Sequence, residues 1–333
     1  MIDKAVNKSV QAIRRKGLSR ARVRRKASSW REEDTLEGKL VETGVVILPT
    51  RGCSWARKSG CTMCGYVYDA GDLGDTELAQ IFKDTVSSLG QVSYLKIFTS
   101  GSFFDSREVS DELMSSVVQT VNDAGIFQLQ VESRPEYVKA DGLASVVDML
   151  NPKLEVGIGL ETSSDIVREK CVNKGFTFAD YEKAVQICNS LDVLVKTYLL
   201  LKPPFMLERE VISDAVKSAL DAERVGSSKI SINPMNIQNM TLVELLWKRG
   251  EYRPPWLWSL VDVLKQLAEA GIKIPVLSHP TAGGRKRGAH NCGECDSTVL
   301  NAIQEFSKTQ DPSTLSKLDC KCKRHWQDYL KLE

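Results

Sequence analysis

Short apolar runs alternate with longer amphipathic segments along most of the 333-residue chain. The runs are rich in Val, Ile and Leu, which is typical of buried strands, whereas the longer segments repeat apolar residues at helical spacing. The runs predict strands at 40–48, 94–98, 128–132, 154–160, 193–201, 230–232 and 272–277. Helices are predicted at 77–89, 110–124, 144–149, 178–191, 208–225 and 258–270.

The order of these elements predicts an α/β fold. Strands that alternate with helices pair in parallel, because each parallel connection needs a crossover. Six to seven such units are enough for a partial (β/α)6-7 barrel over residues 39–279, either open or nearly closed. Ligands of such sheets bind at the carboxyl ends of the strands, so the residues just after each run are the first candidates for a site.

The composition excludes several classes of protein. A hydrophobic content of 42% and a charged content of 26% are ordinary for a folded soluble protein and argue against disorder or a fibre. No apolar run reaches the roughly 18 residues that span a membrane, and the N-terminus is basic rather than an apolar signal core. We therefore expect a cytoplasmic protein with no membrane partner.

Residues 1–38 form a basic N-terminal arm ahead of the first predicted strand. Only one acid, Asp3, precedes Glu32. Between Lys4 and Arg31 the arm carries Lys8, Arg14, Arg15, Lys16, Arg20, Arg22, Arg24, Arg25 and Lys26. Such a block attracts polyanions, because each neutralised phosphate releases condensed counterions. The alternative is a solvated terminal helix, and Trp30 could anchor the arm.

Three cysteines, Cys53, Cys61 and Cys64, lie in the loop after the first predicted strand. Nine cysteines in a chain with no secretory signal are expected to stay reduced and available to metals. Three thiolates in one loop can ligate three irons of a [4Fe–4S] cluster and leave the fourth iron open to a small molecule. The alternatives are a zinc site with a distant fourth ligand and a Cys-x-x-Cys redox pair.

The segment from Arg51 to Tyr66 resembles the cluster loop of the radical S-adenosylmethionine (SAM) superfamily, whose open iron binds the amino and carboxylate groups of SAM. Its spacing of seven residues and then two departs from the commoner three and then two, and Met63 stands where many members carry an aromatic residue. The resemblance implies a [4Fe–4S] cluster on the three cysteines as the catalytic centre, with SAM as a second cofactor.

Three later segments resemble SAM-binding features of the same superfamily. Residues 99–104 resemble the loop that receives the SAM amino group, residues 132–136 a third-strand segment of the subgroup with the Elongator catalytic subunit, and residues 157–162 a segment that contacts the nucleoside. Lys196, in the apolar run at 193–201, is added because a lysine there could pair with a carboxylate. The predicted cofactor-binding residues are then Ser100, Gly101, Ser102, Glu132, Ser133, Arg134, Glu161 and Lys196.

The side-chain chemistry of these residues agrees with that assignment. Gly101 permits a close backbone approach, and Glu132 and Glu161 can accept hydrogen bonds from hydroxyl or ammonium groups. Lys196 could pair with a carboxylate. The alternatives are ordinary salt bridges or helix caps for the acids, and a lysine that reaches the surface.

A second group of four cysteines lies in residues 280–333, a predicted C-terminal metal-binding module. The knuckles Cys292-x-x-Cys295 and Cys320-x-Cys322 supply four soft ligands, which suits tetrahedral Zn²⁺; an auxiliary iron–sulfur cluster is the alternative. Two histidines, His290 and His325, flank the knuckles and either replace a thiolate or lie at the surface. The remaining cysteines, Cys171 and Cys188, are expected in the core.

Basic and aromatic residues are interleaved around the second knuckle. They are Lys321, Lys323, Arg324, Trp326 and Tyr329. This mixture suits phosphate contact and base stacking, which favours nucleic-acid binding; the alternative is a structural zinc staple with a solvated basic surface.

Over almost its whole length the chain is similar to the archaeal radical SAM proteins of archaeosine biosynthesis, both in residues 51–66 and in the basic run that ends at Cys292. The resemblance implies action on tRNA with a lysine adduct of 7-cyano-7-deazaguanine at position 15 in the D-loop. A lysine transferase related to tRNA-guanine transglycosylase makes the adduct, and an electron donor reduces the cluster. The enzyme is then a C–N lyase that cleaves the lysine Cε–N bond and leaves archaeosine.

Four amides after the strand at 230–232 are expected to bind the substrate, or else simply to form a turn. They are Asn233, Asn236, Gln238 and Asn239. Removal of residues 1–30 is expected to weaken tRNA affinity and to spare SAM cleavage. Two other functions are kept open: a different Elongator-like radical SAM tRNA modifier, and a non-catalytic zinc-containing tRNA-binding protein.

Overall fold

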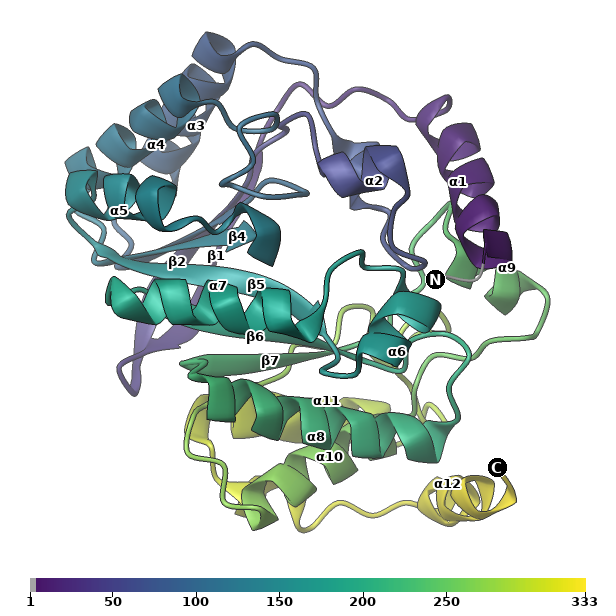
Figure 1. Cartoon of the computed structure of the whole chain (residues 1–333). Coiled ribbons are helices and arrows are strands. Elements are labelled where there is room, and N and C mark those ends of the chain that lie inside the picture. Colours follow the sequence, from purple (N-terminus) through teal and green to yellow (C-terminus); the bar gives the residue numbers. More distant parts are fainter. Residues whose placement is uncertain (1–3) are drawn as a thin grey trace.

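The computed structural model describes residues 4–333, and within them the strands form one eight-stranded sheet in sequence order (Figure 1). The first two strands pair antiparallel and every later neighbour pairs in parallel. The strands are β1 (Ser28–Leu36), β2 (Lys39–Ile47), β3 (Tyr94–Phe98), β4 (Gln128–Ser133), β5 (Lys153–Glu161), β6 (Leu194–Leu201), β7 (Lys229–Pro234) and β8 (Val276–Leu277). The predicted α/β partial barrel is therefore confirmed.

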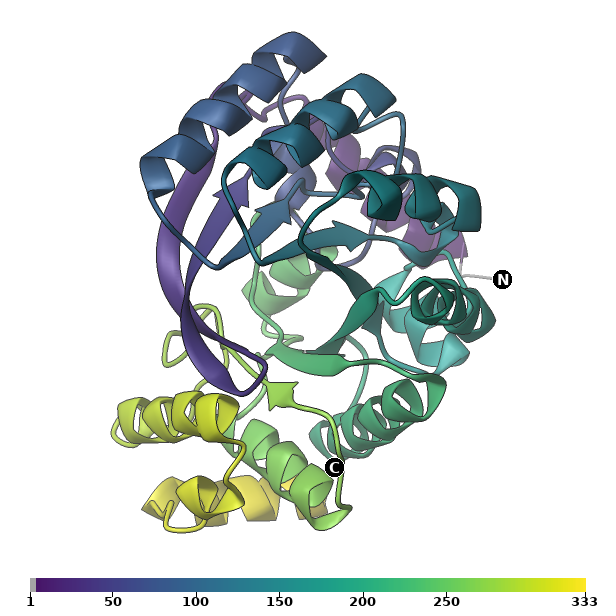
Figure 2. The same ribbon diagram turned by 90° about the vertical axis from the view of Figure 1, so that its left-hand side faces the viewer.

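Helices cover the outer face of the curved sheet (Figure 2). Those that follow the parallel strands are α3 (Asp75–Leu89), α4 (Asp111–Asp123), α5 (Ala140–Met149), α7 (Phe178–Ser190), α8 (Glu208–Val225) and α10 (Leu257–Glu269). Their bounds follow local signals: Ser110 caps α4 by accepting a hydrogen bond from Leu113 N, and Thr177 and Asp180 form a capping box on α7. Gly226 ends α8 in the left-handed conformation.

Helix α1 (Lys4–Leu18) precedes the sheet. Shorter helices lie in the connections between strands and longer helices. They are α2 (Ser54–Lys58), η1 (Tyr66–Asp69), η2 (Pro135–Tyr137), α6 (Asp165–Val167), the π-helix η3 (Arg168–Val172), α9 (Leu242–Lys248) and η4 (Pro312–Leu315). Figure 1 shows α1, α2, α6 and α9 gathered at one end of the barrel. This is the end at which the parallel strands finish, because the loops after β2, β5 and β7 lead into α2, α6 and α9.

Strand β1 was not expected from the sequence. Most of its side chains are exposed or half-buried, so it lacks the apolar alternation that identifies a strand. Trp30 does not enter the core: its side chain is 42% exposed, and its Nε1 donates to Glu32 Oε2 at 2.8 Å. The described strands show no β1–β8 pairing, and Lys308 Nζ, on α11 (Asp296–Thr309), lies 3.1 Å from Glu33 Oε2 on β1.

The last 50 residues contain two further helices, α11 and α12 (Lys321–Leu332). Their buried residues Val299, Ile303, Phe306 and Trp326 belong to the same apolar cluster as the barrel, so the segment packs on the main core. In the described part of the chain, no helix combines the length and apolarity that crossing a membrane requires.

Candidate active site and metal centre

The cysteine loop begins directly after β2, at the carboxyl edge of the sheet. Cys53 stands at the N-terminal end of α2, and this short helix fills the unusual seven-residue interval before Cys61. Cys61 is buried, and Cys53 and Cys64 are half-buried. The long spacing therefore inserts one helical turn into the loop, and Cys53 and Cys64 still lie near enough to Cys61 to oppose its ionisation.

A second segment, at the end of the π-helix η3, holds this loop in place. Asn173 has a left-handed backbone (φ 59°), and its Nδ2 donates to Ser59 Oγ at 3.0 Å and to Gly60 O at 2.7 Å. The indole of Trp55 donates to Asn173 O at 2.9 Å, and Thr62 N donates to Val172 O at 2.9 Å. π-Helical turns often mark functional sites, and this one supports the cysteines.

The predicted SAM-binding glycine lies against the cysteine loop. A Cβ on Gly101 would stand 2.7 Å from Cys53 Cα and 2.0 Å from Glu108 Oε2, so only glycine fits there. The backbone of Arg134 donates to Ser102 Oγ at 3.1 Å, which joins this loop to the end of β4. Ser100 has a left-handed backbone (φ 64°).

Buried Glu108 ties these loops together. Its Oε2 accepts a hydrogen bond from Ser102 N at 2.6 Å, and its Oε1 lies 2.7 Å from Thr50 Oγ1, at the end of the β2 segment. Burial raises the pKa of Glu108 to about 7. A carboxyl group thus connects the start of the cysteine loop with the glycine loop.

The predicted acidic residues lie at the ends of adjacent strands. Burial raises the pKa of Glu132, on β4, to about 7, and the hydroxyl of Tyr198 hydrogen-bonds to this carboxyl. Glu161, at the end of β5, has a left-handed backbone (φ 68°) and forms an ion pair with Lys174. Ser133 is buried, and its hydroxyl donates to Arg134 O at 3.0 Å.

Lys196 lies deeper in the barrel, at the third residue of β6. Its Nζ donates to Gln130 Oε1 at 3.2 Å and stands 5.5 Å from the Tyr198 ring. Burial, together with the charge of Lys96, lowers the pKa of Lys196 to about 8. The lysine is thus part of a buried polar layer beneath the strand ends.

Positive charge surrounds the three thiols. Burial raises the pKa of Cys61 to about 12 and raises that of Cys64, while Lys174 and Arg134 oppose this effect at Cys61 and Arg14 opposes it at Cys64. Arg134 Nη2 donates to Lys174 O at 2.8 Å. Buried thiols of this kind keep their protons until a metal displaces them, and the cations then stabilise the thiolates.

A cleft of about 670 Å³ opens beside the cysteine loop. The arm, the segment after Cys64, the turn after β7 and Arg287 line it, and three predicted substrate residues, Asn236, Gln238 and Asn239, lie in its wall. Gln238 Oε1 accepts from Gly65 N, and Asn239 Oδ1 accepts from Arg287 Nη2 at 3.0 Å. Asn233 is on β7 itself, where Ser231 Oγ donates to its Oδ1 at 3.2 Å.

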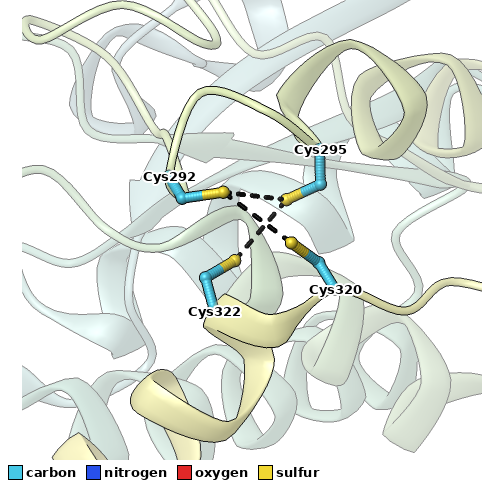
Figure 3. A group of neighbouring side chains, drawn as sticks. All are labelled: Cys292, Cys295, Cys320 and Cys322. Atoms are coloured by element: carbon cyan, nitrogen blue, oxygen red, sulfur yellow. Dashed lines mark hydrogen bonds between the residues drawn. The ribbon is translucent and has the colours of Figure 1, made fainter.

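The four tail cysteines converge on one point (Figure 3). Cys292 and Cys295 precede α11, and Cys320 and Cys322 lie at the start of α12. The Sγ–Sγ distance is 3.9 Å from Cys292 to Cys295, 3.7 Å from Cys292 to Cys320 and 3.6 Å from Cys295 to Cys322. All four sulfurs lie within 4.8 Å of one another, so together they could hold one metal ion.

Neighbouring groups support this cluster. The indole of Trp258 donates to Cys322 Sγ at 3.2 Å, and the backbone N–H of Cys295 lowers the pKa of Cys292 to about 7. His290 Nδ1 instead lies 2.8 Å from Gly288 O. His325 lines a surface hollow with Lys321, and neither histidine joins the described group of ligands.

Comparison with known proteins places the chain in a family. An archaeosine synthase subunit beta of Methanosarcina acetivorans is 40% identical over 336 residues, covering 99% of this chain and 97% of the relative. The chain belongs to the archaeosine synthase subunit beta family. A relative of the same name from Thermococcus kodakarensis is 38% identical over 307 residues, covering 90% of this chain and 94% of that protein. No family model matches the chain.

One solved structure supports the fold of this archaeosine synthase subunit beta homologue, and a second is similar to it. Methylornithine synthase has a TM-score of 0.51 at 11% identity, over 82% of this chain and 69% of that one. A queuine lyase from Clostridium spiroforme, bound to SAM and queuine, has a TM-score of 0.48 at 19% identity, over 66% of this chain and 89% of that one. The predicted radical SAM-like partial barrel is the fold of this family member.

Several residues of the candidate site were not predicted from the sequence. Lys174 lies in an Asn-Lys-Gly turn after η3, a turn signal that marks the segment but not its position beside the cysteines. Glu108 and Tyr198 carry no local motif. Arg14 was counted with the other basic residues of the arm, which were expected to contact a polyanion, whereas the structure buries it at 4% exposure.

Proposed function

We propose that this chain is the radical SAM subunit that completes archaeosine, by cleaving the lysine Cε–N bond of the 7-cyano-7-deazaguanine adduct at tRNA position 15. The observation that carries the proposal is the three-cysteine loop packed against Gly101 at the carboxyl edge of the barrel. The relatives named archaeosine synthase subunit beta support the choice of pathway.

The three loop thiols fit a [4Fe–4S] cluster better than a single zinc ion. Among the described residues, only the four tail cysteines form a group whose ligand atoms all lie within 4.8 Å of one another. Cys53, Cys61 and Cys64 are not such a group, whereas three thiolates suit a cluster in which each bonds a different iron. When cluster and SAM are bound, they supply abstraction of a hydrogen atom from an unactivated C–H bond.

Residues around the loop would orient SAM and exclude water. The backbone at Gly101 offers a close approach, and Glu132 and Glu161 would accept hydrogen bonds from SAM hydroxyl or ammonium groups. Lys174 holds Glu161 as an ion pair, which fixes that carboxylate in one orientation. A fixed and dry pocket matters because reactive carbon radicals attack nearby C–H bonds indiscriminately.

The cleft beside Cys64 would hold the modified nucleoside and its lysine. Asn236 and Asn239 present amide groups to it, and Arg20, Arg22 and Arg24 of the arm supply positive charge for phosphates. Beyond the cleft, the arm exposes further basic residues to solvent. These are Lys8, Arg15, Lys16, Arg25 and Lys26. A tRNA bound along the arm thus brings one nucleoside to the cysteine loop.

The proposal includes two protein partners. The relatives' name, subunit beta, implies a companion subunit, which we identify with the lysine transferase related to tRNA-guanine transglycosylase. An electron donor is needed as well, because the cluster acts in its reduced form.

We further propose that the tail cysteines hold one Zn²⁺. Four thiolates about 2.3 Å from one ion, at the corners of a tetrahedron, stand about 3.8 Å apart. Three of the six Sγ–Sγ distances, 3.6, 3.7 and 3.9 Å, match that edge length, and the others stay within 4.8 Å. An auxiliary iron–sulfur cluster needs wider spacing, because its thiolates bond different irons.

The test is conversion of tRNA that carries the lysine adduct. Anaerobically purified protein should be brown and contain iron and sulfide, and with SAM and a reductant it should convert the adduct to archaeosine, as measured by mass spectrometry of tRNA nucleosides. An unchanged adduct with a loaded cluster overturns the proposed reaction. A colourless protein with zinc alone supports the tRNA-binding alternative, and a change at another base supports the Elongator-like one.

A matched pair of glycine variants separates the site from general stability. Gly101→Ala introduces a Cβ within 2.7 Å of Cys53 Cα, so we expect at least about tenfold weaker SAM binding and loss of cluster iron. Gly142→Ala, in α5, meets no atom within 4 Å and should stabilise the fold by roughly 0.5–1 kcal/mol without affecting SAM. Equal SAM affinities in the two variants contradict the role of Gly101.

A further inference from the structure

Helix α1 packs against the cysteine loop through one face. Val10, Arg14 and Gly17 are buried at helical spacing, while Arg15 and Lys16 between them are exposed. The helix contacts α2, η1 and α9, all at the carboxyl edge of the barrel (Figure 1). Gly17 permits this approach, because a Cβ there would overlap the Tyr68 ring at 2.4 Å.

The guanidinium of Arg14 is inserted into the cysteine loop. Its Nη2 donates to Cys61 O at 3.2 Å, and its Cζ stands 5.1 Å from the Tyr68 ring centre. A Cβ at Gly60 would lie 2.7 Å from Nη2, so the glycine makes room for the guanidinium. Arg14 therefore contacts the residue just before Cys61 as well as Cys61 itself.

This arginine is buried without the partners that a buried charge normally has. Its Nε and Nη1 have no hydrogen-bond partner among the described residues, and no described carboxylate forms an ion pair with it. A buried guanidinium that has no carboxylate partner and unsatisfied N–H groups costs folding free energy, even though Nη2 donates to Cys61 O. An anionic group at the loop would remove that cost, and a thiolate-ligated iron–sulfur cluster is such a group.

We propose that Arg14 is a positioning residue for the cluster, and that its free N–H groups and positive charge act on the cluster's sulfur atoms and raise its reduction potential. The inference rests on the cluster of the proposed function. Reduction adds negative charge to the cluster, so a fixed cation and hydrogen-bond donors beside it stabilise the reduced form most.

The N-terminal arm then has a second role, because it carries the arginine that contacts the cysteine loop. Loss of residues 1–30 was expected to weaken tRNA binding alone, but such a truncation also removes Arg14 and the helix that covers the loop. We now expect it to disturb the cluster, and hence SAM cleavage, as well. Residues 1–3, with Asp3, lie outside the described part of the chain.

The test is a redox titration of the anaerobic full-length protein without tRNA, followed by electron paramagnetic resonance. Arg14→Met keeps an unbranched apolar stem but removes the charge and the donors, and should make the cluster about tenfold harder to reduce at a fixed potential, a negative shift of about 59 mV for one electron. Arg15→Met, one residue along on the exposed face, is the matched control and should leave the potential unchanged.

If the Arg14→Met protein does not retain its iron–sulfur cluster, Arg14→Lys is the second variant to measure. It retains the charge with fewer donors, so its potential should fall between those of the wild type and the methionine variant. A wild-type potential in either Arg14 variant, with full iron content, overturns the inference. A wild-type protein that binds no cluster overturns the proposed function instead, and a cluster that does not yield archaeosine leaves the potential measurement valid.

Discussion

Glu108 shows how a single buried carboxyl group can connect two functional loops. Thr50 Oγ1 lies 2.7 Å from both Thr99 O and Glu108 Oε1, yet a threonine hydroxyl has only one proton to donate. A protonated Glu108 resolves this, since the carboxyl then donates to Thr50 while Thr50 donates to Thr99. The pKa of about 7 agrees with a carboxyl group that stays neutral in weakly acidic solution.

This protonation makes stability depend on pH. Because the folded-state pKa of Glu108 lies above its ordinary value of 4.5, the folded state binds the proton more tightly. The associated stability, about 3 kcal/mol at most, is fully present below pH 4.5 and is lost as the pH rises through about 7. Urea unfolding between pH 5 and 8 should show this loss in the wild type and a flatter profile in Glu108→Gln. The exposed Glu112→Gln variant is the control, and a profile of Glu108→Gln as steep as the wild type's contradicts the assignment.

At the scale of elements, the sequence predicted the repeating part of the fold and missed its edges. The strands β3 to β7 and their helices carry regular apolar spacing, and their predicted positions agree closely with the observed ones. Strand β1 is mostly polar and exposed, so it pairs with β2 without the apolar alternation that identifies a strand in the sequence. The strand predicted at 272–277 is reduced to Val276–Leu277, since the residues before it continue the turn after α10.

The residues of the candidate site likewise fall into those that the sequence predicted and those that it did not. The cysteines of both groups and the loop around Gly101 were predictable because short spacings identify them. Lys174, Glu108 and Arg14 were not, because their roles depend on contacts between segments far apart in the sequence. Nothing in a basic block of nine residues distinguishes the one arginine that turns inward.

A buried ion pair fixes β1 to the barrel. Lys96 on β3 pairs with Asp34 and, at 2.7 Å, with Glu32. Although burial opposes ionisation, Lys96 holds the pKa of Asp34 well below its usual range. Asp34→Ala leaves Lys96 buried without its main partner, so we expect a loss of about 3–5 kcal/mol in the free energy of unfolding.

Denaturant titration measures that loss, and the double variant Asp34→Leu/Lys96→Met provides the comparison. It removes both charges, so its loss should be smaller than that of Asp34→Ala alone. Exposed Glu33→Ala, next along β1, should change stability by no more than about 1 kcal/mol. A double variant less stable than Asp34→Ala argues against an electrostatic origin.

For the whole molecule, the tail cysteines connect the end of the chain to the barrel. They bring together the starts of α11 and α12, whose apolar residues share the main core with α10. Metal at this site should therefore stabilise the whole fold rather than a separate module, because the cysteines and the core packing constrain the same helices.

Metal removal tests this connection. Cys292→Ala/Cys295→Ala should lose one zinc per chain by elemental analysis and lower the Tm of the whole transition by roughly 5 °C or more. Cys188→Ala, a buried cysteine outside both groups, is the control that should keep its zinc. A barrel transition that stays at the wild-type temperature while the zinc is lost would show that the tail folds independently.

Two consecutive residues of helix α1 lie on different faces. Arg14 contacts the cysteine loop, and Arg15 is exposed to solvent. Residues 19–27, which join the helix to β1, contain neither helix nor strand, so the helix is held mainly by its own docking. Any polyanion that prefers the docked helix then favours cluster retention, and by thermodynamic reciprocity a loaded cluster favours the polyanion by the same factor. Under the proposed function, the protein would bind tRNA most tightly when its cluster is loaded.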